Sequence, residues 1–462
     1  MTSRPPSRPS SARSRPAAPP PASPLRWLGI AAVVGIVAFF AIREPQEDGP
    51  PRGVGGAGGG EPTPAAPAAP PRCHVAAEGY RVGKVEAEDG EAGGGGQGPE
   101  PDRFAPFSVE VGRAVALGQG YAVGIKRVVE EPEGASTYAE VAVLGKAGAG
   151  DTVRLGRTRP DMDAPVVAAS GEGWVAAMLE PHASGLALRL AQMRDGALAW
   201  GAELEQARDE SLAFDVAFGE RAGVVVWDEV SDDGKQARIV VATVDPASLK
   251  IRERAAPISR PEVDAELPRL VRRPGGFWLA YVARARTKEP SRDNGEEDDQ
   301  FRGERIEPAW LELGSLDEDG RLQGTFRPVT PRDGHLLAYD LELGRDGAVI
   351  VAWRDDDTPS GAEGGRVTMM LVEPSGAGQE QLVAEDDVGA GVPSLVAGWL
   401  ALPDGAGHVR LAPVGADGAL EGELRQEDAF GIGQVLASRG DELLVAKPGG
   451  RAVTLAVLAC QR

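Results

Sequence analysis

The side chains with the clearest chemical potential in this sequence are carboxylates gathered in three short segments. They are Asp228, Glu229, Asp232 and Asp233; then Asp293, Glu296, Glu297, Asp298 and Asp299; then Asp355, Asp356 and Asp357. Clustered carboxylate oxygens suit Ca²⁺ and also attract a basic partner. None of the segments has the twelve-residue pattern of an EF-hand loop. The alternative interpretation is a set of solvated hydrophilic loops that also discourage aggregation.

Patterns typical of catalytic or metal sites are absent from the sequence. The four histidines, His74, His182, His335 and His408, are far apart and form no pair at metal-ligand spacing. There is no Gly-x-Ser-x-Gly elbow, phosphate-binding loop or dinucleotide-binding fingerprint. We therefore nominate no catalytic residue and no metal ligand, and we expect no cofactor other than Ca²⁺ at the acidic segments.

The elements that must position the acidic segments recur along the chain. Seven times, roughly fifty residues apart, a turn leads into a short apolar run that reads as a strand. The runs begin at Gly120, Gly173, Gly223, Gly276, Gly347, Gly398 and Glu442. In the second unit, residues 165–169, 174–178, 186–193 and 196 onward read as four antiparallel strands. The turns that contain Gly196, Gly320, Gly376 and Gly418 are expected to use the positive φ that glycine allows.

With this period, the chain resembles β-propeller repeat proteins over roughly residues 74–460. The resemblance concerns architecture, because neither a repeated Trp-Asp pattern nor a full kelch pattern is present. It implies an all-β fold with a single seven-bladed β-propeller, six or eight blades being the alternatives. A propeller is a scaffold that hosts many unrelated activities, so the fold alone assigns none.

The only two cysteines, Cys73 and Cys460, bracket the repeats. The last unit supplies three strands, over 434–438, 442–446 and 451–459, and lacks a fourth. If residues 75–85 supply it, antiparallel to the third, Cys73 faces Cys460. We therefore predict a disulfide that closes the ring, with two unpaired thiols in a cytoplasmic protein as the alternative.

The N-terminal region predicts membrane attachment. Residues 1–26 carry five arginines and no acid, and residues 27–42 are apolar and uncharged. We predict a disordered cytoplasmic N-terminus followed by a single-pass signal anchor in a bacterial inner membrane, with the remainder in the periplasm. Secretion after cleavage of a signal peptide is the alternative. Residues 43–72 are rich in Pro, Gly and Ala and are expected to be a disordered linker, with a second low-complexity stretch at 86–101 inside the 73–462 propeller domain.

Charge and topology together suggest a role. Beyond the anchor, 44 basic residues stand against 70 acidic ones, a balance of −26, which disfavours nucleic acid as a partner. In a propeller, the three acidic segments fall in second-to-third-strand loops, which lie on one face. We expect a tethered binding or assembly module of the cell envelope, whose acidic face meets an envelope protein or basic ligand. The alternative is a hydrolase or lyase acting on envelope glycans, with paired carboxylates in the central funnel.

Overall fold

A computed structural model gives the fold of the repeat region. It describes residues 73–83, 109–131, 134–145, 150–171, 173–182, 185–194, 196–205, 213–231, 234, 236–286, 308–356, 365–385, 391–404, 407–427, 429–449 and 452–461. The predicted anchor at 27–42, the linker at 43–72 and the stretch at 86–101 lie outside these residues. The part of the chain described here contains no helix with the length and apolar character needed to cross a bilayer.

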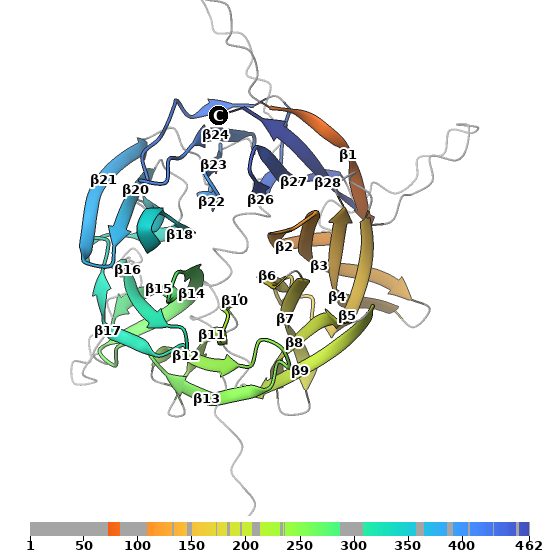
Figure 1. Cartoon of the computed structure of the whole chain (residues 1–462), viewed down its shortest axis with the longest axis horizontal. Coiled ribbons are helices and arrows are strands. Elements are labelled where there is room, and N and C mark those ends of the chain that lie inside the picture. Colours follow the sequence, from red (N-terminus) through yellow and green to blue (C-terminus); the bar gives the residue numbers. More distant parts are fainter. Residues whose placement is uncertain are drawn as a thin grey trace, which may run out of the picture.

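Seven four-stranded antiparallel sheets stand around a common centre, which confirms the seven-bladed propeller (Figure 1). Blade 1 comprises β2 (Val109–Leu117), β3 (Gly120–Glu131), β4 (Gly134–Gly145) and β5 (Gly150–Thr158). Blade 2 comprises β6 (Val166–Ser170), β7 (Gly173–His182), β8 (Gly185–Arg194) and β9 (Ala197–Glu205). Blade 3 comprises β10 (Phe214–Phe218), β11 (Gly223–Val230), β12 (Ala237–Val244) and β13 (Ile251–Pro257). Blade 4 comprises β14 (Val263–Arg273), β15 (Gly276–Ala285), β16 (Ala309–Asp317) and β17 (Leu322–Pro328). Blade 5 comprises β18 (Leu336–Leu343), β19 (Val349–Asp356), β20 (Gly365–Glu373) and β21 (Gly376–Ala384). Blade 6 comprises β22 (Ser394–Val396), β23 (Trp399–Pro403), β24 (Val409–Pro413) and β25 (Arg425–Gln426). Blade 7 comprises β26 (Gln434–Arg439), β27 (Glu442–Gly449), β28 (Ala452–Cys460) and β1 (Cys73–Gly83). A 3₁₀ turn, η3 (Arg345–Gly347), joins β18 to β19.

The seventh blade is completed by the strand that comes first in the sequence. β1 pairs antiparallel with β28, and Cys73 stands directly opposite Cys460. A disulfide joins the two cysteines, which are 387 positions apart. Both the predicted strand exchange and the predicted disulfide are confirmed. The ring is thus closed by strand pairing and by a covalent bond at the same place.

The ring has two faces that differ in the turns they carry. The turns between second and third strands lie with the connections between blades; the side chain of Gln236, for example, donates from the β11–β12 turn to the carbonyl of Val263 at the start of β14 (3.0 Å). We call this the connection face. The other hairpin turns form the hairpin face, where the amide of Cys460 donates to Asp441 in the β26–β27 turn (2.7 Å). Because Cys73 lies beside Cys460, the chain enters the propeller on the hairpin face.

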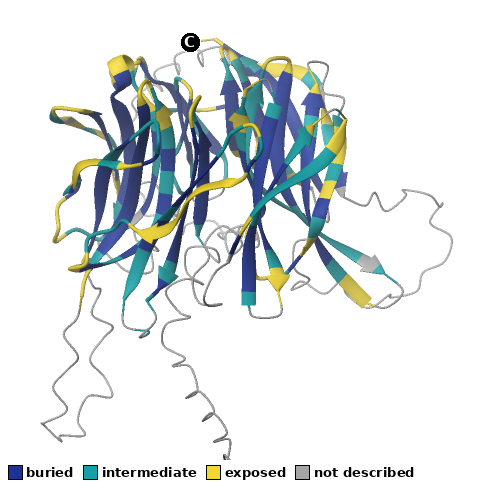
Figure 2. Cartoon of the chain, turned by 60° about the horizontal axis from the view of Figure 1, so that its bottom comes forward, coloured by how far each residue is buried: buried dark blue, intermediate teal, exposed yellow. Residues whose placement is uncertain are grey.

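Buried residues are spread over the strands around the ring rather than gathered in one central mass (Figure 2), and they form clusters that join neighbouring blades. Leu188 of blade 2 packs in one buried cluster with Val216 and Trp227 of blade 3, and Val123 of blade 1 shares a cluster with Leu444 of blade 7. Second strands are covered on both sides, so they read as continuous apolar runs. Each such buried side chain stabilises the fold by about 1.5–3 kcal/mol. Those runs are the reason that the repeat is visible in the sequence.

One prediction about the turns needs correction. Gly196, Gly320 and Gly418 have φ values of 77°, 82° and 78°, as predicted, but Gly376 is not in the left-handed region. The register explains the difference, because Glu373 pairs with Gly376, which places Pro374 and Ser375 at the centre of that turn. In the second blade the pair is Arg194 with Ala197, so Gly196 occupies a central turn position.

Candidate functional site

The first strands of the blades surround the centre of the ring, and a bulge in one of them presents an arginine there. The ladder between β2 and β3 is interrupted between Val111 and Ala114, which leaves Gly112 and Arg113 outside the regular register. A β-bulge of this kind redirects a side chain. A Cβ atom at Gly112 would lie 2.8 Å from the carbonyl oxygen of Pro165, so the close approach of blade 2 also requires glycine at this position.

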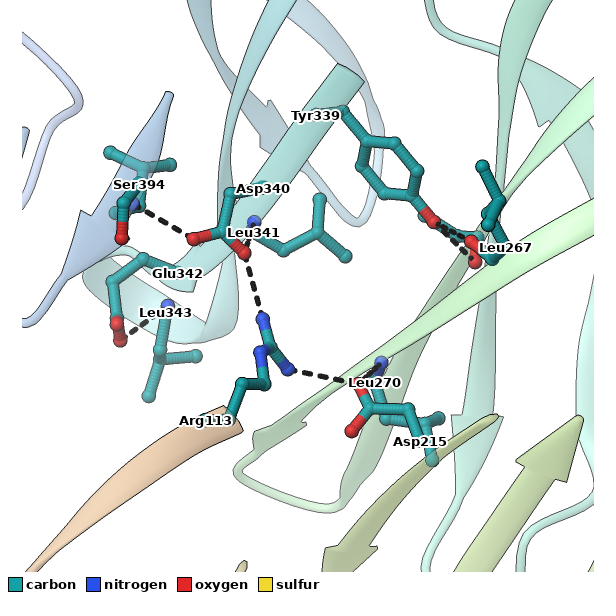
Figure 3. Close-up of polar contacts among 12 residues, drawn as sticks. Arg113, Asp215, Leu267, Leu270, Tyr339, Asp340, Leu341, Glu342, Leu343 and Ser394 are labelled. Carbon is teal, nitrogen blue, oxygen red and sulfur yellow. Dashed lines mark hydrogen bonds and ion pairs between the residues drawn. The ribbon is translucent and has the colours of Figure 1, made fainter. Parts of the chain in front are cut away.

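Arg113 forms ion pairs with two carboxylates from other blades (Figure 3). Its Nη1 lies 2.9 Å from Oδ2 of Asp215 in β10, and its Nη2 lies 2.7 Å from Oδ1 of Asp340 in β18. The side chains of the two aspartates are 1% and 13% exposed. Burial by itself would lower the pKa of Arg113, but the charges of Asp215 and Asp340 outweigh that effect and raise it. One guanidinium therefore links blades 1, 3 and 5 across the centre.

Both aspartates also bind the backbone of the next blade. Asp215 Oδ2 accepts from the amide of Leu270 in β14 (2.8 Å), and Asp340 Oδ2 accepts from the amide of Leu395 in β22 (2.9 Å). Their remaining oxygens accept from the amides of Val216 and Leu341, each at 2.9 Å. Every carboxylate oxygen of the pair thus has a donor. We call Arg113, Asp215 and Asp340 the central triad.

A second polar contact fixes a strained position beside the triad. Leu267 has a φ of 55°, an unfavourable value for a residue with a branched side chain, and it lies at the break in register between β14 and β15. Its amide donates to Asp228 Oδ2 (3.0 Å), and its carbonyl accepts from the hydroxyl of Tyr339 (2.5 Å). The same hydroxyl contacts the carbonyl of Ala280 (3.1 Å). Burial raises the pKa of Tyr339, so the hydroxyl keeps the proton that it donates.

Glu342 follows Asp340 by two positions, on the same side of β18. Its Oε1 accepts from the amide of Leu343 (2.9 Å) and its Oε2 from the amide of Ala397 (3.1 Å). Burial, reinforced by the charge of Asp340, raises the pKa of Glu342 to about 7, although these two backbone donors and Arg113 act in the opposite direction. This carboxyl group therefore changes charge near neutral pH.

Another charged group lies where the connection between blades 1 and 2 enters β6. Lys126 Nζ lies 2.5 Å from Glu110 Oε2 and donates to the carbonyl of Met162 (2.6 Å). Asp163 is exposed overall, but the surrounding protein partly desolvates its carboxyl group. This desolvation and the charge of Glu110 raise the pKa of Asp163, whereas the charges of Lys126 and Arg269 act to lower it. Ionisable groups from blade 1, blade 4 and the connection between blades 1 and 2 thus lie close enough to affect the charge of Asp163.

Of the twelve acids predicted to form an acidic binding face, four are described, and each has an intramolecular contact. Asp228 accepts from the amides of Ala213 and Leu267, both at 3.0 Å, and Asp355 accepts from the amide of His335 (2.6 Å). Glu229 pairs with Arg238 (2.6 Å), and Asp356 with Arg354 (2.8 Å) in a pair that is almost fully buried. Asp232, Asp233, Asp293, Glu296, Glu297, Asp298, Asp299 and Asp357 lie outside the described residues. That this face binds a partner stays a prediction.

The histidines are all described and lie in different places. His182 is 3.9 Å from Glu203, and His408 is 3.4 Å from Asp404. Within the described ranges, no group of three or more His, Cys, Asp or Glu side chains could hold a metal ion.

Sequence reasoning did not find the central triad. Asp215 and Asp340 lie 102 and 227 positions after Arg113, and no local motif joins the three residues. One signal was present: Asp215 and the pair Asp340 and Glu342 interrupt otherwise apolar first strands. A charge in such a strand must find a partner inside the ring, because the strand itself is largely buried.

Comparisons with known proteins add the following. No model of a known protein family matches the sequence, and no curated protein matches it. Among solved structures, a Mycobacterium tuberculosis puromycin-hydrolyzing peptidase is 15% identical, with a TM-score of 0.42 over 74% of this chain and 50% of its own. The Dos1 propeller is 12% identical (TM-score 0.41; 76% and 95% of the two chains), and the polysaccharide lyase Uly1 is 9% identical (TM-score 0.45; 75% and 89%).

The chain thus spans about half the length of the puromycin-hydrolyzing peptidase. Likenesses at these values bear on the fold and carry no argument about activity. The fold and its centre define the class: a disulfide-closed seven-bladed β-propeller whose central carboxylates are engaged by one arginine.

Proposed function

We propose that the protein is a membrane-tethered binding module of the cell envelope. The observation that carries this proposal is the engagement of Asp215 and Asp340 by Arg113 and by backbone amides. Glycan hydrolysis with general acid and base catalysis needs two carboxyl groups that can reach a substrate and exchange protons with it. The two aspartates of the central triad instead hold blades together, which favours a scaffold over a hydrolase or lyase.

The face on which the chain enters the ring suggests that one face is turned towards the tether and the other face binds the partner. Residues 27–42 would anchor the protein in the inner membrane, and residues 43–72 would lead to Cys73 on the hairpin face. The three acidic segments occur in the sequence at or just after the ends of β11, β15 and β19, which are strand ends on the connection face, on the other side of the ring. They would therefore point away from the entry of the tether. A Pro-rich linker extends by about 3 Å per residue, so the ring would reach tens of Å from the membrane.

The partner would be an envelope protein or ligand with a basic surface. The loop between β15 and β16 contributes Asp293, Glu296, Glu297, Asp298 and Asp299, and its neighbours add further carboxylates. Concentrated negative charge on one rim accelerates association with a positively charged partner, and added salt weakens this attraction. Ca²⁺ would bind the same carboxylates and compete with such a partner.

The decisive variant changes the charge of one loop without changing its length. Asp293, Asp298 and Asp299 are replaced by Asn, and Glu296 and Glu297 by Gln, in the full-length protein. The matched control neutralises five acids of the hairpin face in the same way: Glu318, Asp346, Glu373, Asp417 and Asp441. Both proteins lose the same charge, so only the position of the charge differs.

Binding is measured to an immobilised hexalysine peptide and to solubilised envelope proteins, at low and at physiological salt and with Ca²⁺ or a chelator. The loop variant is expected to lose binding in both assays, and the control variant to retain it. Equal retention by the two variants would contradict the acidic face. The tether is tested separately: the protein is expected to resist alkaline extraction from membranes, and Val34→Arg with Val37→Arg to release it.

A further inference from the structure

The hairpin face holds a cavity of about 570 Å³ where blades 3, 4 and 5 meet. Arg272 and Arg273 line it from the end of β14, Glu220 from the β10–β11 turn, Glu318 from the β16–β17 turn and Leu343 from the end of β18. This volume is typical of sites for small molecules. The lining combines two cations, two anions and the apolar side chains of Pro274, Phe277 and Leu343, and the two arginines differ in whether a carboxylate pairs with them.

Arg272 and Glu318 each have an exposed partner of opposite charge. Arg272 Nη2 lies 3.7 Å from Glu220 Oε1, and the side chains of Arg272 and Glu220 are 56% and 86% exposed. Glu318 lies 3.9 Å from Arg221. Exposed pairs of this kind contribute little and exchange readily with water.

Arg273 is different, because among the described residues no carboxylate pairs with it. Its Nε donates to the carbonyl of Phe277 (3.4 Å), and its guanidinium lies 5.4 Å from the ring centre of Trp278. These contacts fix the plane of the group and leave its two terminal nitrogens without a carboxylate. Partial burial lowers the pKa of Arg273, and no neighbouring anion in the described part of the chain offsets this effect.

The repeat supplies its own comparison in blade 7. Arg439 ends β26 as Arg273 ends β14, and it also lines a cavity on the hairpin face, of about 440 Å³. Its guanidinium also lies 5.4 Å from an aromatic ring, that of Tyr121. There, however, the residue across the turn is Glu442, whose carboxylate accepts from Nε (3.2 Å) and from Nη2 of Arg439. In blade 4 the residue across the turn is Gly276, which has no side chain.

We propose that the cavity between blades 3, 4 and 5 binds a carboxylate-bearing small molecule, whose carboxylate pairs with the terminal nitrogens of Arg273 and so supplies the anion that Glu442 supplies to Arg439. The planar guanidinium matches a carboxylate with two parallel hydrogen bonds. Leu343, 38% exposed, offers an apolar contact to the rest of the ligand. The site lies on the hairpin face and is lined by none of the predicted acidic residues, so its test does not depend on the proposed function.

A carboxylate could come from a free organic acid or from the end of a polypeptide chain, and three probes separate these sources from other anions. Succinate represents the free acid, N-acetylleucine represents a chain terminus, and inorganic phosphate represents a different anion. N-acetylleucine amide is the matched neutral ligand. Each is titrated into the full-length protein in low-chloride buffer, by calorimetry and by the shift in thermal midpoint.

Three variants accompany the wild type. Arg273→Gln removes the proposed contact, Arg439→Gln removes the equivalent arginine in blade 7, and Arg327→Gln removes another arginine whose pKa burial lowers and which donates to the backbone carbonyl of Glu373 (2.7 Å). Without ligand, Arg273→Gln is expected to unfold within about 2 °C of the wild type, because no native ion pair is lost.

At least one carboxylate probe is expected to bind the wild type, Arg439→Gln and Arg327→Gln alike, and to bind Arg273→Gln roughly 10- to 100-fold more weakly. Preference for succinate indicates a free acid, and preference for N-acetylleucine indicates a chain terminus. The amide is expected not to bind. Equal affinity in all four proteins, binding of the amide as tight as that of the acid, stronger binding of phosphate than of both carboxylates, or no binding at all would overturn the proposal.

Discussion

Arg113 in blade 1 lies 2.7 Å from Asp340 in blade 5, although the two residues are 227 positions apart and their blades are not neighbours. In a propeller each blade packs mainly on the two beside it, so contacts across the centre add constraints that neighbour packing does not supply. Asp340 also binds the backbone of blade 6, and Asp215 that of blade 4. Through one arginine, five of the seven blades are coupled.

Replacement of Arg113 by Met is expected to destabilise the fold strongly. The change keeps much of the side-chain volume but leaves Asp215, 1% exposed, and Asp340, 13% exposed, without their cation. Removing one partner of a buried ion pair costs about 3–5 kcal/mol. The measurement is the free energy of unfolding in urea. A loss below about 1 kcal/mol would mean that water or other groups solvate the two carboxylates.

The matched control for this prediction is the triple variant with Arg113→Met, Asp215→Asn and Asp340→Asn. Because it carries no uncompensated charge, it should recover part of the loss seen in the single variant. Recovery would separate the electrostatic contribution of the triad from the packing of the arginine stem.

Loss of the Cys73–Cys460 disulfide is expected to loosen the closed ring. The bond closes a loop between residues 387 positions apart, for which the chain-entropy relation gives a ceiling of about 6 kcal/mol. We expect the double variant Cys73→Ser with Cys460→Ser to unfold at a lower urea concentration than the oxidised wild type. Dithiothreitol should bring the wild type to the same midpoint and leave the variant unchanged. A wild-type midpoint insensitive to the reductant, in a sample shown to be reduced, would contradict the prediction.

The architecture was predictable because the features that set it are local and repeated. Runs such as Gly223–Val230 are apolar throughout because second strands are covered on both faces, and turns such as the one at Gly196 need glycine for its φ. The closure was predictable because one unit lacked a strand and two cysteines stood at matching ends. Each inference needed only a short segment and a count.

The centre was not predictable, because its contacts depend on the global geometry. Nothing around Gly112 and Arg113 marks a bulge that directs the side chain inward, and only the closed ring brings Asp215 and Asp340 within reach of it. For a similar reason Asp228 was interpreted as a surface acid. Its carboxylate accepts hydrogen bonds from the amides of Ala213 and Leu267, which are 15 and 39 positions away in the sequence, and no local motif indicates these contacts.

Tyr339→Phe tests whether the strained backbone at Leu267 is held from blade 5. The change removes one hydroxyl and leaves the carbonyls of Leu267 and Ala280 without that donor. A buried carbonyl that loses its partner costs about 1–3 kcal/mol. Tyr80→Phe is the matched control, since its exposed hydroxyl contacts only Thr152 (2.9 Å) among the described residues. Similar unfolding free energies for the two variants would argue that water replaces the Tyr339 hydroxyl.

Glu342→Gln is expected to change how the stability of the protein depends on pH. The pKa of Glu342 is raised to about 7 in the fold, from 4.5 as the ordinary value. Below pH 4.5 the carboxyl group is neutral in both states, and its contribution to stability is fully present. As the pH rises towards and through 7, the unfolded chain has released the proton while the folded protein must ionise a partly buried group, so that contribution is lost.

Gln cannot ionise, so the variant escapes this loss. Between pH 5 and pH 8 the unfolding free energy of the variant should rise relative to that of the wild type by about 1–2 kcal/mol, a value reduced for partial exposure of the site. Any constant cost of replacing a carboxylate oxygen by an amide NH₂ beside Leu343 and Ala397 cancels in this difference, as does the titration of Asp163 and the histidines. Glu423→Gln, at a side chain 81% exposed, is the matched control and should show no such trend. Parallel pH profiles for the wild type and Glu342→Gln would mean that Glu342 is ionised at pH 5 in the folded protein and that the fold does not hold its proton.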